Sequence, residues 1–190
     1  MKIFARANRI NQSIIDLLKR INITEVAIGF ESGSEEVLKA INKNCTSEQN
    51  IEAAEILFRN KIDTVASYVL GLPGETDETL EKTLHQASYL RELAIKYLGH
   101  PPQEIIGNLI EINPGSYAFR EILHAFPEKY RENDILGIKE TQDDYFKVKY
   151  GFTTDKEIAV FRAKLARYSK KLNSLGRYTY PAGWVLEDML

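Results

Sequence analysis

Polar residues and glycines follow directly after four apolar, β-branched runs of this sequence. They are Arg6 and Asn8, residues 31–34 (ESGS), Ser67 with residues 71–75 (GLPGE), and residues 113–116 (NPGS). Guanidinium, carboxylate and hydroxyl groups can bind a polar ligand, and glycines let that ligand approach the backbone closely. The pattern indicates a ligand site assembled from strand ends.

The four runs, residues 2–7, 24–30, 63–70 and 104–112, alternate with segments of helical spacing. Helix starts are predicted near Asn11, Ser34, Thr46, Thr76 and Thr154, each of which can cap a helix. Strands separated by such helices run parallel, and ligands bind at their carboxyl ends. The order suits an open doubly wound sheet or part of a (βα) barrel, and periodicity does not choose between them.

The composition excludes several classes of protein. Lys and Arg number 25 against 27 Asp and Glu, so we expect neither a nucleic-acid partner nor an anionic membrane surface. No apolar run approaches the length that spans a bilayer, and no signal peptide precedes the first strand, so we expect a cytoplasmic protein. Cys45 is the only cysteine, which excludes an intramolecular disulfide and a cysteine-rich metal site.

Three motifs occur in a characteristic order: residues 28–34 (IGFESGS), residues 40–44 (AINKN) followed by Thr46, and residues 69–76 (VLGLPGET). Together they resemble the second half of a radical S-adenosylmethionine (SAM) domain. The closest branch contains proteins similar to coproporphyrinogen oxidase, methylthiotransferases and cobalamin-binding radical SAM proteins. The resemblance covers roughly residues 2–118, because residues 113–116 are similar to the P-G-T that follows the family's sixth strand.

The resemblance implies an α/β fold: a partial (βα) barrel of about four parallel strands, the third to sixth of the family's barrel. We place this unit at residues 1–118 and a mostly helical C-terminal extension, rich in Tyr and Phe, at residues 119–190. In the intact parent, the resemblance implies a [4Fe-4S] cluster that cleaves SAM reductively to a 5′-deoxyadenosyl radical, acting on a small-molecule substrate.

Six positions match the family's SAM-binding positions, and all six are cofactor-binding candidates. Arg6, at the end of the first strand here, would contact SAM. Glu31 would accept hydrogen bonds from the SAM ribose or amino group, and Lys43 would pair with the methionyl carboxylate. Ser67 would reach the ribose, and Gly71 and Leu72 would pack against adenine.

The sequence departs from the family at the cluster. The family's C-x3-C-x2-C motif and the glycine-rich segment after its second strand are both absent, and Cys45 reads as an incidental thiol. Met1 stands directly before the strand that matches the family's third. We interpret the chain as a fragment that is inactive alone, with no catalytic or metal-binding residue and no bound cofactor.

Cobalamin-dependent methylation and tetrapyrrole or oxidative cyclase-type chemistry both fit the parent, so cobalamin is a further candidate cofactor. The alternative is a non-catalytic α/β module for interaction or assembly. An unpaired strand edge is a template for another chain, so we expect self-association through residues 2–7. The aromatic residues of 117–184, Trp184 included, could instead fold back over the exposed face.

Overall fold

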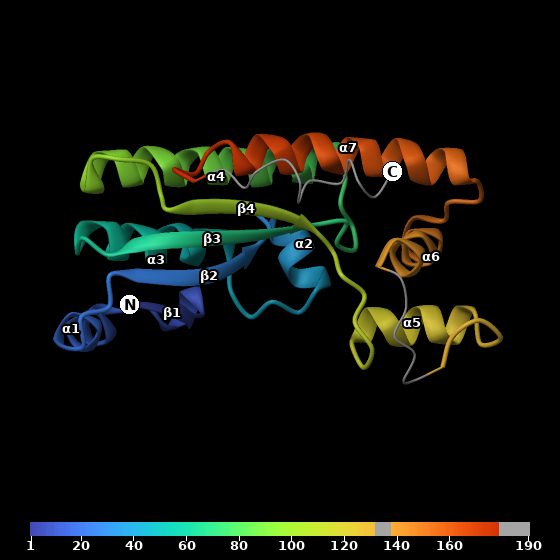
Figure 1. Ribbon diagram of the computed structural model, residues 1–190, viewed down its shortest axis with the longest axis horizontal. Helices are drawn as coiled ribbons and strands as arrows, with labels where there is room; N and C mark the ends of the chain where they lie inside the picture. The colour runs from blue at the N-terminus through green and yellow to red at the C-terminus, as the bar shows by residue number, and fades with distance from the viewer. Residues whose placement is uncertain (132–137, 179–190) are drawn as a thin grey trace.

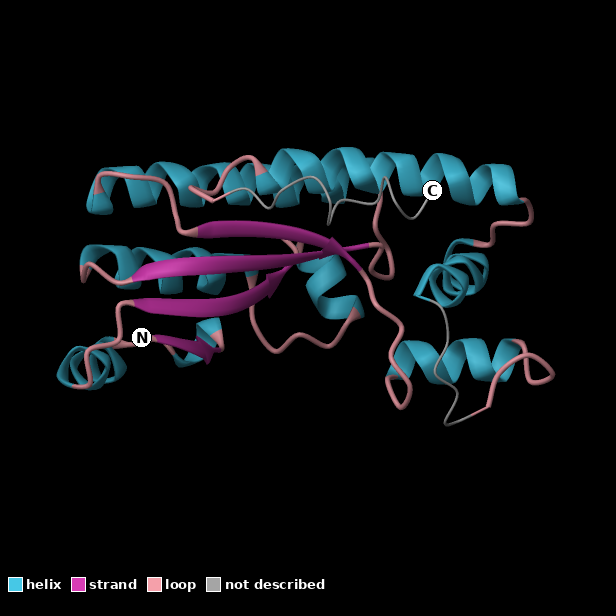
Figure 2. Ribbon diagram, viewed as in Figure 1, coloured by secondary structure: helices cyan, strands magenta, loops and turns pink. Residues whose placement is uncertain are grey.

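The computed structural model describes residues 1–131 and 138–178, so part of the predicted C-terminal extension, with Trp184, lies outside the described residues. Four parallel strands form one sheet in the order β1-β2-β3-β4 (Figure 2). They are β1 (Lys2–Ala5), β2 (Glu25–Glu31), β3 (Asp63–Leu70) and β4 (Glu104–Leu109). The helices are α1 (Gln12–Arg20), α2 (Glu35–Ala40), α3 (Ser47–Arg59), α4 (Asp77–Leu98), α5 (Tyr117–Ala125), α6 (Ile138–Tyr150) and α7 (Asp155–Asn173).

The strand order is that of a barrel segment. Neighbouring strands in the sheet are also consecutive in the chain, so crossovers of one hand place their helices on the same face. A doubly wound sheet would reverse its order and carry helices on both faces. The predicted α/β fold with four parallel strands is therefore confirmed, and the barrel type is the one that fits its topology.

The apolar core lies between the sheet and its helices. From β2 it takes Val26, Ile28 and Phe30, which pack in one buried cluster with Ile15 of α1 and Leu57 of α3. Side chains alternate between the two faces of a strand. Ala27 and Gly29 of β2 and their register partners in β3, Val65 and Ser67, therefore face away from the helices.

Helix α7 packs against β4, beside α4 (Figure 1). A Cβ at Gly107 of β4 would stand 2.7 Å from the Leu172 side chain, so the missing side chain permits the close approach. The Ser169 hydroxyl donates to the Gly107 carbonyl at 2.6 Å, and the Gly107 N–H donates to Asn173 at 2.8 Å. Residues from both sides of position 118 thus share one core, and the domain boundary drawn there stays a prediction.

Most predicted helix starts are confirmed by their caps. Asn11 caps α1, and Thr46, Thr76 and Thr154 each form a reciprocal capping box with the third residue of their helix. Ser34 is the N-cap residue of α2, as predicted, but its hydroxyl donates to Glu36 and makes no side-chain capping hydrogen bond. The strands β1 and β4 are shorter than predicted, because a 3-10 helix (Ala7–Arg9) follows β1 and an irregular segment follows Leu109.

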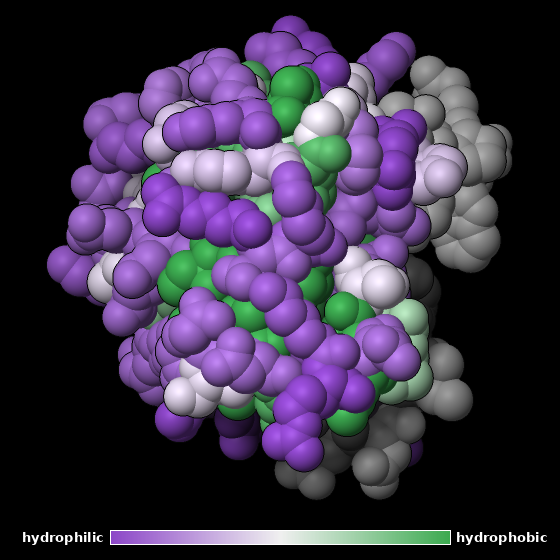
Figure 3. Space-filling model, turned by 90° about the vertical axis from the view of Figure 1, so that its left-hand side faces the viewer, coloured by the Kyte–Doolittle hydropathy of each residue, from purple (hydrophilic) through white to green (hydrophobic). Residues whose placement is uncertain are grey.

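Helices α5 and α6 lie beyond the carboxyl ends of the strands, opposite the end that carries α1 (Figure 1). Figure 3 faces the α1 end, whose surface is mostly hydrophilic with hydrophobic patches between the polar residues. Within the described ranges, none of the helices combines the length and the apolar character that crossing a membrane requires.

Candidate functional site

The site begins with an unusual backbone conformation at the end of β2. Glu31 has φ +62°, in the left-handed region that non-glycine residues rarely adopt, and the pairing of β2 with β3 shifts register between Gly29 and Glu31. Backbone strain of this kind clusters at ligand sites, where the surrounding structure holds it in place. The bulge aims the Glu31 side chain back over the face of the sheet that the helices leave free.

Lys43 meets Glu31 over that face. The loop after α2 turns back through the bond from the Lys43 N–H to the Leu38 carbonyl (2.9 Å). The Lys43 ammonium then lies 2.7 Å from Glu31 Oε1, and the two side chains remain 26% and 23% exposed. A charged pair that is partly exposed can exchange its mutual contact for a ligand that carries both signs of charge.

The backbone of Gly29 lies directly beneath the Glu31–Lys43 pair. A Cβ at Gly29 would stand 2.4 Å from Glu31 Oε1 and 3.5 Å from the Lys43 ammonium nitrogen. Ser67 of β3 is the register partner of Gly29 and faces the same side of the sheet. The structure therefore brings four groups together: the carboxylate, the ammonium, a bare glycine backbone and a hydroxyl on the adjacent strand.

The residues after Glu31 are fixed by α4. The Ser32 and Thr83 hydroxyls are hydrogen bonded at 3.1 Å, and the Gly33 N–H donates to the Thr83 hydroxyl at 3.0 Å. A Cβ at Gly33 would stand 2.6 Å from the Lys82 carbonyl oxygen. Gly33 is therefore required by close packing on α4 rather than by a ligand.

The buried side-chain amide of Asn50 is hydrogen bonded to the backbone at the carboxyl end of β2. Asn50 of α3 is fully buried, donates to the Phe30 carbonyl at 3.1 Å and accepts from the Cys45 thiol at 3.3 Å. Burial raises the pKa of that thiol. Cys45 is thus a buried hydrogen-bond donor, in agreement with its reading as an incidental thiol.

Gly71 and Leu72 lie just past β3, in a loop covered by α6. Gly71 has φ +90°, and its N–H donates to Glu75 Oε2 at 2.6 Å. Leu72 is only 6% exposed, and its carbonyl accepts from the Tyr150 hydroxyl at 2.5 Å. These two positions are at the expected end of the sheet, with the Leu72 side chain turned into the protein.

Glu75 belongs to the strand-end pattern of the sequence but is not among the six cofactor-binding candidates. Its side chain is buried, its Oε1 has no hydrogen-bond partner among the described residues, and burial raises its pKa to about 8. Its place directly after residues 71–74 was the available signal, but a carboxylate in a turn is normally solvated. Asn50 and Thr83 were missed because nothing in their helical pattern marks a polar residue that turns inward.

Arg6 follows Ala5, the register partner of Ile28, so its backbone stands beside Gly29 at the carboxyl end of the sheet. It follows β1 with an exposed side chain and precedes the 3-10 helix Ala7–Arg9. The neighbouring Asn8 instead donates to the Asn44 carbonyl at 2.7 Å, which ties the end of β1 to the loop that carries Lys43.

The residues present do not fit an iron–sulfur cluster. Such a cluster is held by cysteine thiolates, and the sequence holds one cysteine, which is buried. Among the described residues, no group of three or more His, Cys, Asp or Glu side chains is arranged to hold a metal ion. No step that requires the cluster is assigned to this chain.

Fold and site together define an α/β barrel segment with a charged pair at its strand ends. Residues 1–87 match the family model of the radical SAM superfamily. This match covers the N-terminal part of the chain and agrees with the resemblance to the radical SAM superfamily that the motifs predicted.

Two curated relatives and one solved structure are similar to the chain. The anaerobic magnesium-protoporphyrin IX monomethyl ester cyclase of Rubrivivax gelatinosus is 35% identical over 77 residues, 40% of this chain and 14% of the relative. An uncharacterized methyltransferase of Pyrococcus horikoshii is 29% identical over 93 residues, 49% of this chain and 20% of the relative. The coproporphyrinogen III oxidase of Escherichia coli, described as a radical SAM enzyme, has a similar fold, with TM-score 0.50 and 16% identity over 87% of this chain and 32% of that one.

The chain thus spans between about a seventh and a fifth of these two curated relatives.

Proposed function

We propose that this chain binds S-adenosylmethionine at the carboxyl ends of β2 and β3 and serves as the SAM-binding part of a radical SAM enzyme. The observation that carries the proposal is the Glu31–Lys43 pair, 2.7 Å apart over the bare backbone of Gly29. The match of residues 1–87 to the radical SAM family model supports the choice of ligand.

The chemistry of SAM matches the groups on this face. The carboxylate at its methionyl end pairs with the Lys43 ammonium, and its amino group or its ribose hydroxyls donate to the Glu31 carboxylate. The Ser67 hydroxyl, one strand further, adds a contact to the ribose. Gly29 keeps the space above the sheet free, because any side chain there would meet Glu31.

The radical reaction itself requires thiolates from outside this sequence. A bound cluster would supply the electron that cleaves SAM, while the residues of this chain bind SAM and orient it. The chain alone is therefore inactive in this proposal. Anaerobic reconstitution followed by iron analysis tests it, since stoichiometric iron on the chain alone would contradict it.

For the parent we propose tetrapyrrole or oxidative cyclase-type chemistry, which the similarity to the magnesium-protoporphyrin cyclase favours. A second candidate is methylation that uses cobalamin, favoured by the similarity to the methyltransferase of Pyrococcus horikoshii. In both, the substrate is a small molecule that enters at the same end of the sheet as SAM.

Isothermal titration of SAM into the chain tests the proposed function. Lys43→Met and Glu31→Gln should each weaken SAM binding by about tenfold or more, because each removes a charge-assisted hydrogen bond. Lys82→Met is the matched control: Lys82 pairs with Glu36 and Glu78 at the surface, so its loss should leave the affinity unchanged. Absence of SAM binding, or equal affinity in all four proteins, would favour a non-catalytic interaction module.

A further inference from the structure

Hydrogen bonds from two directions hold the loop that follows β3. The Gly71 N–H donates to Glu75 Oε2 at 2.6 Å, from within the loop. The Leu72 carbonyl accepts from the Glu75 N–H at 3.2 Å and from the Tyr150 hydroxyl at 2.5 Å, the latter across from α6. The peptide groups on both sides of Leu72 are therefore fixed in direction.

Helix α6 lies directly against this loop. Phe146 and Tyr150 are one helical turn apart, so they share one face of α6. A Cβ at Gly71 would stand 2.9 Å from the Phe146 ring, which means that the ring packs on the bare backbone there. The φ angle of Gly71 is also in the left-handed region, so both the backbone conformation and the contact with the Phe146 ring require glycine.

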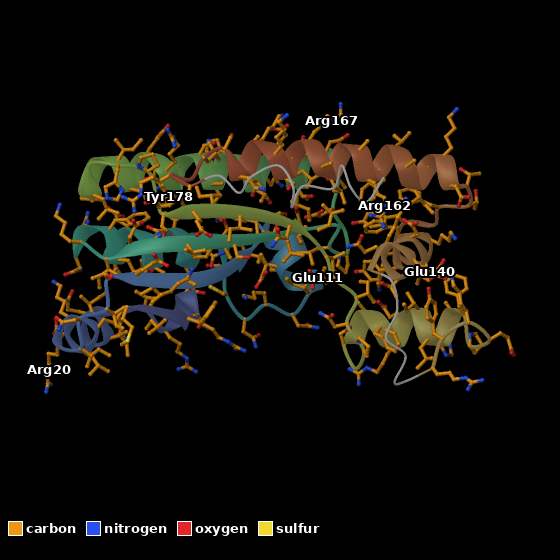
Figure 4. All side chains as sticks on the ribbon, in the orientation of Figure 1. Arg20, Glu111, Glu140, Arg162, Arg167 and Tyr178 are labelled. Carbon is orange, nitrogen blue, oxygen red and sulfur yellow. The ribbon has the colours of Figure 1, made fainter. Side chains whose placement is uncertain are left out.

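The position of α6 is itself fixed by buried polar contacts. Arg162 of α7 is 2% exposed and reaches toward α6 (Figure 4), where it donates to Asp143 at 2.6 Å and to Gln142 at 2.8 Å. Gln142 in turn donates to the Ile110 carbonyl at 2.6 Å, just past β4. A continuous set of contacts therefore runs from α7 through α6 to the loop, and all of α6 and α7 lies outside residues 1–87.

Burying the Glu75 carboxyl group in this loop costs free energy. Its Oε1 is buried with no partner among the described residues, and Tyr145 and Tyr150 of α6 are the titratable groups coupled to it. A buried polar atom left unpaired in a native fold calls for an explanation. The hydrogen bond that Glu75 Oε2 accepts from the Gly71 N–H explains the burial of this side chain, because the bond sets the conformation of the loop.

We propose that Tyr150 and Glu75 are positioning residues that hold the Gly71–Leu72 backbone in the shape that receives the nucleoside of SAM. The inference rests on the proposed function and extends it. The segment after the superfamily match shapes the SAM site through α6, without itself touching the ligand.

The test compares Tyr150→Phe with Tyr168→Phe. Both changes remove one hydroxyl that donates to an acceptor in the first half of the chain, Leu72 in one case and the exposed Glu81 in the other. For Tyr150→Phe we expect faster hydrogen exchange at the Gly71 and Glu75 amides and a SAM dissociation constant raised by roughly three- to tenfold, the worth of one hydrogen bond. Tyr168→Phe should change neither quantity.

A comparison of Glu75→Gln with Glu75→Ala tests the role of Glu75. The Gln side chain keeps an oxygen that accepts from the Gly71 N–H, so SAM affinity should be retained near neutral pH, whereas Glu75→Ala should lose it. A merely structural role for Glu75 would lower the stability of both variants without separating their affinities.

Each remaining outcome decides the proposal. If exchange at Gly71 is unchanged in Tyr150→Phe, α6 does not hold the loop and the inference fails. If exchange rises but SAM affinity stays equal or increases, α6 does not position the loop for SAM, while the proposed function stands. If the wild-type chain binds no SAM, the proposed function fails first, and the inference fails with it.

Discussion

The Lys43 ammonium and the Glu31 carboxylate lie 2.7 Å apart, although one belongs to a loop and the other ends a strand. The left-handed conformation of Glu31 and the backbone turn before Lys43 both serve to bring them together. Because the pair remains partly exposed, it contributes about 1 kcal/mol or less to the free energy of unfolding. This geometry is the reason for proposing a ligand at the pair.

Gly29→Ala should separate ligand binding from folding. The added methyl would stand 2.4 Å from Glu31 Oε1, so the carboxylate must move and the contact with Lys43 is lost. We expect SAM affinity to fall by about tenfold. The free energy of unfolding, measured with denaturant, should change by less than about 1 kcal/mol. Unchanged affinity in a folded variant would remove Gly29 from the site.

The free energy of unfolding should depend on pH through Glu75. Burial raises the pKa of this carboxyl in the folded protein from 4.5 to about 8, so the folded state binds the proton more tightly than the unfolded state. Its contribution is fully present below pH 4.5 and is lost as the pH rises toward 8, by at most about 1.4 kcal/mol per pH unit.

Glu75→Gln should remove this part of the pH dependence, because the amide does not titrate. Denaturant unfolding at several pH values between 5 and 8 would show it as a flatter curve than that of the wild type. Glu52→Gln, a change at an exposed carboxylate of α3, is the matched control and should keep the wild-type slope. Parallel curves for wild type and Glu75→Gln would show that Glu75 titrates normally.

Arg162→Met should destabilise the protein by about 1 to 3 kcal/mol, since it leaves the buried Gln142 oxygen and the partly exposed Asp143 carboxylate without their donor. Arg167→Met on the same helix is exposed and should cost no more than about 0.5 kcal/mol. Figure 4 labels both side chains on α7. Thermal or denaturant unfolding measures the difference, and similar values for the two variants would mean that Arg162 does not anchor α6.

Self-association is proposed at the outer edge of β1. This strand pairs only with β2 in the described sheet, Phe4 is 86% exposed, and Leu17 and Ile21 expose about half of their surface on the adjacent α1. An unpaired strand edge beside apolar residues favours contact with a second copy. Light scattering should give a mass above the 21.7 kDa of one chain.

Phe4→Glu should shift that equilibrium toward the monomer, because it places a charge in the contact. Val160→Glu changes an equally apolar exposed residue on α7 and should leave the mass unaltered. A wild-type chain that scatters as a monomer at micromolar concentration would refute association through β1.

Local signals in the sequence predicted the elements well. The spacing of Thr46 and Gln49 predicted the capping box that opens α3, and the β-branched run before Gly71 predicted β3 at its observed bounds. The motif order also placed Glu31 and Lys43 at one end of the sheet. These predictions succeed because each depends on residues that are close in the chain.

Contacts between distant residues could not be predicted in this way. Tyr150 and Leu72 are 78 positions apart, and no periodic pattern links a helical tyrosine to a particular carbonyl. Glu75 is buried only because α6 covers its loop, so its raised pKa depends on that same long-range packing. Ser34 is the N-cap of α2 without a side-chain capping bond, because Glu36 offers its hydroxyl a nearby acceptor.

Titration of SAM into the ¹⁵N-labelled chain, followed by amide chemical shifts, tests the SAM site most directly. The account predicts saturable shifts that centre on Gly29, Glu31, Lys43 and Ser67, extend to Gly71, and require about tenfold or more higher SAM concentration in Lys43→Met. Shifts that centre on α5 or α7 instead, or no shifts at millimolar SAM, would contradict a SAM site at the carboxyl ends of β2 and β3.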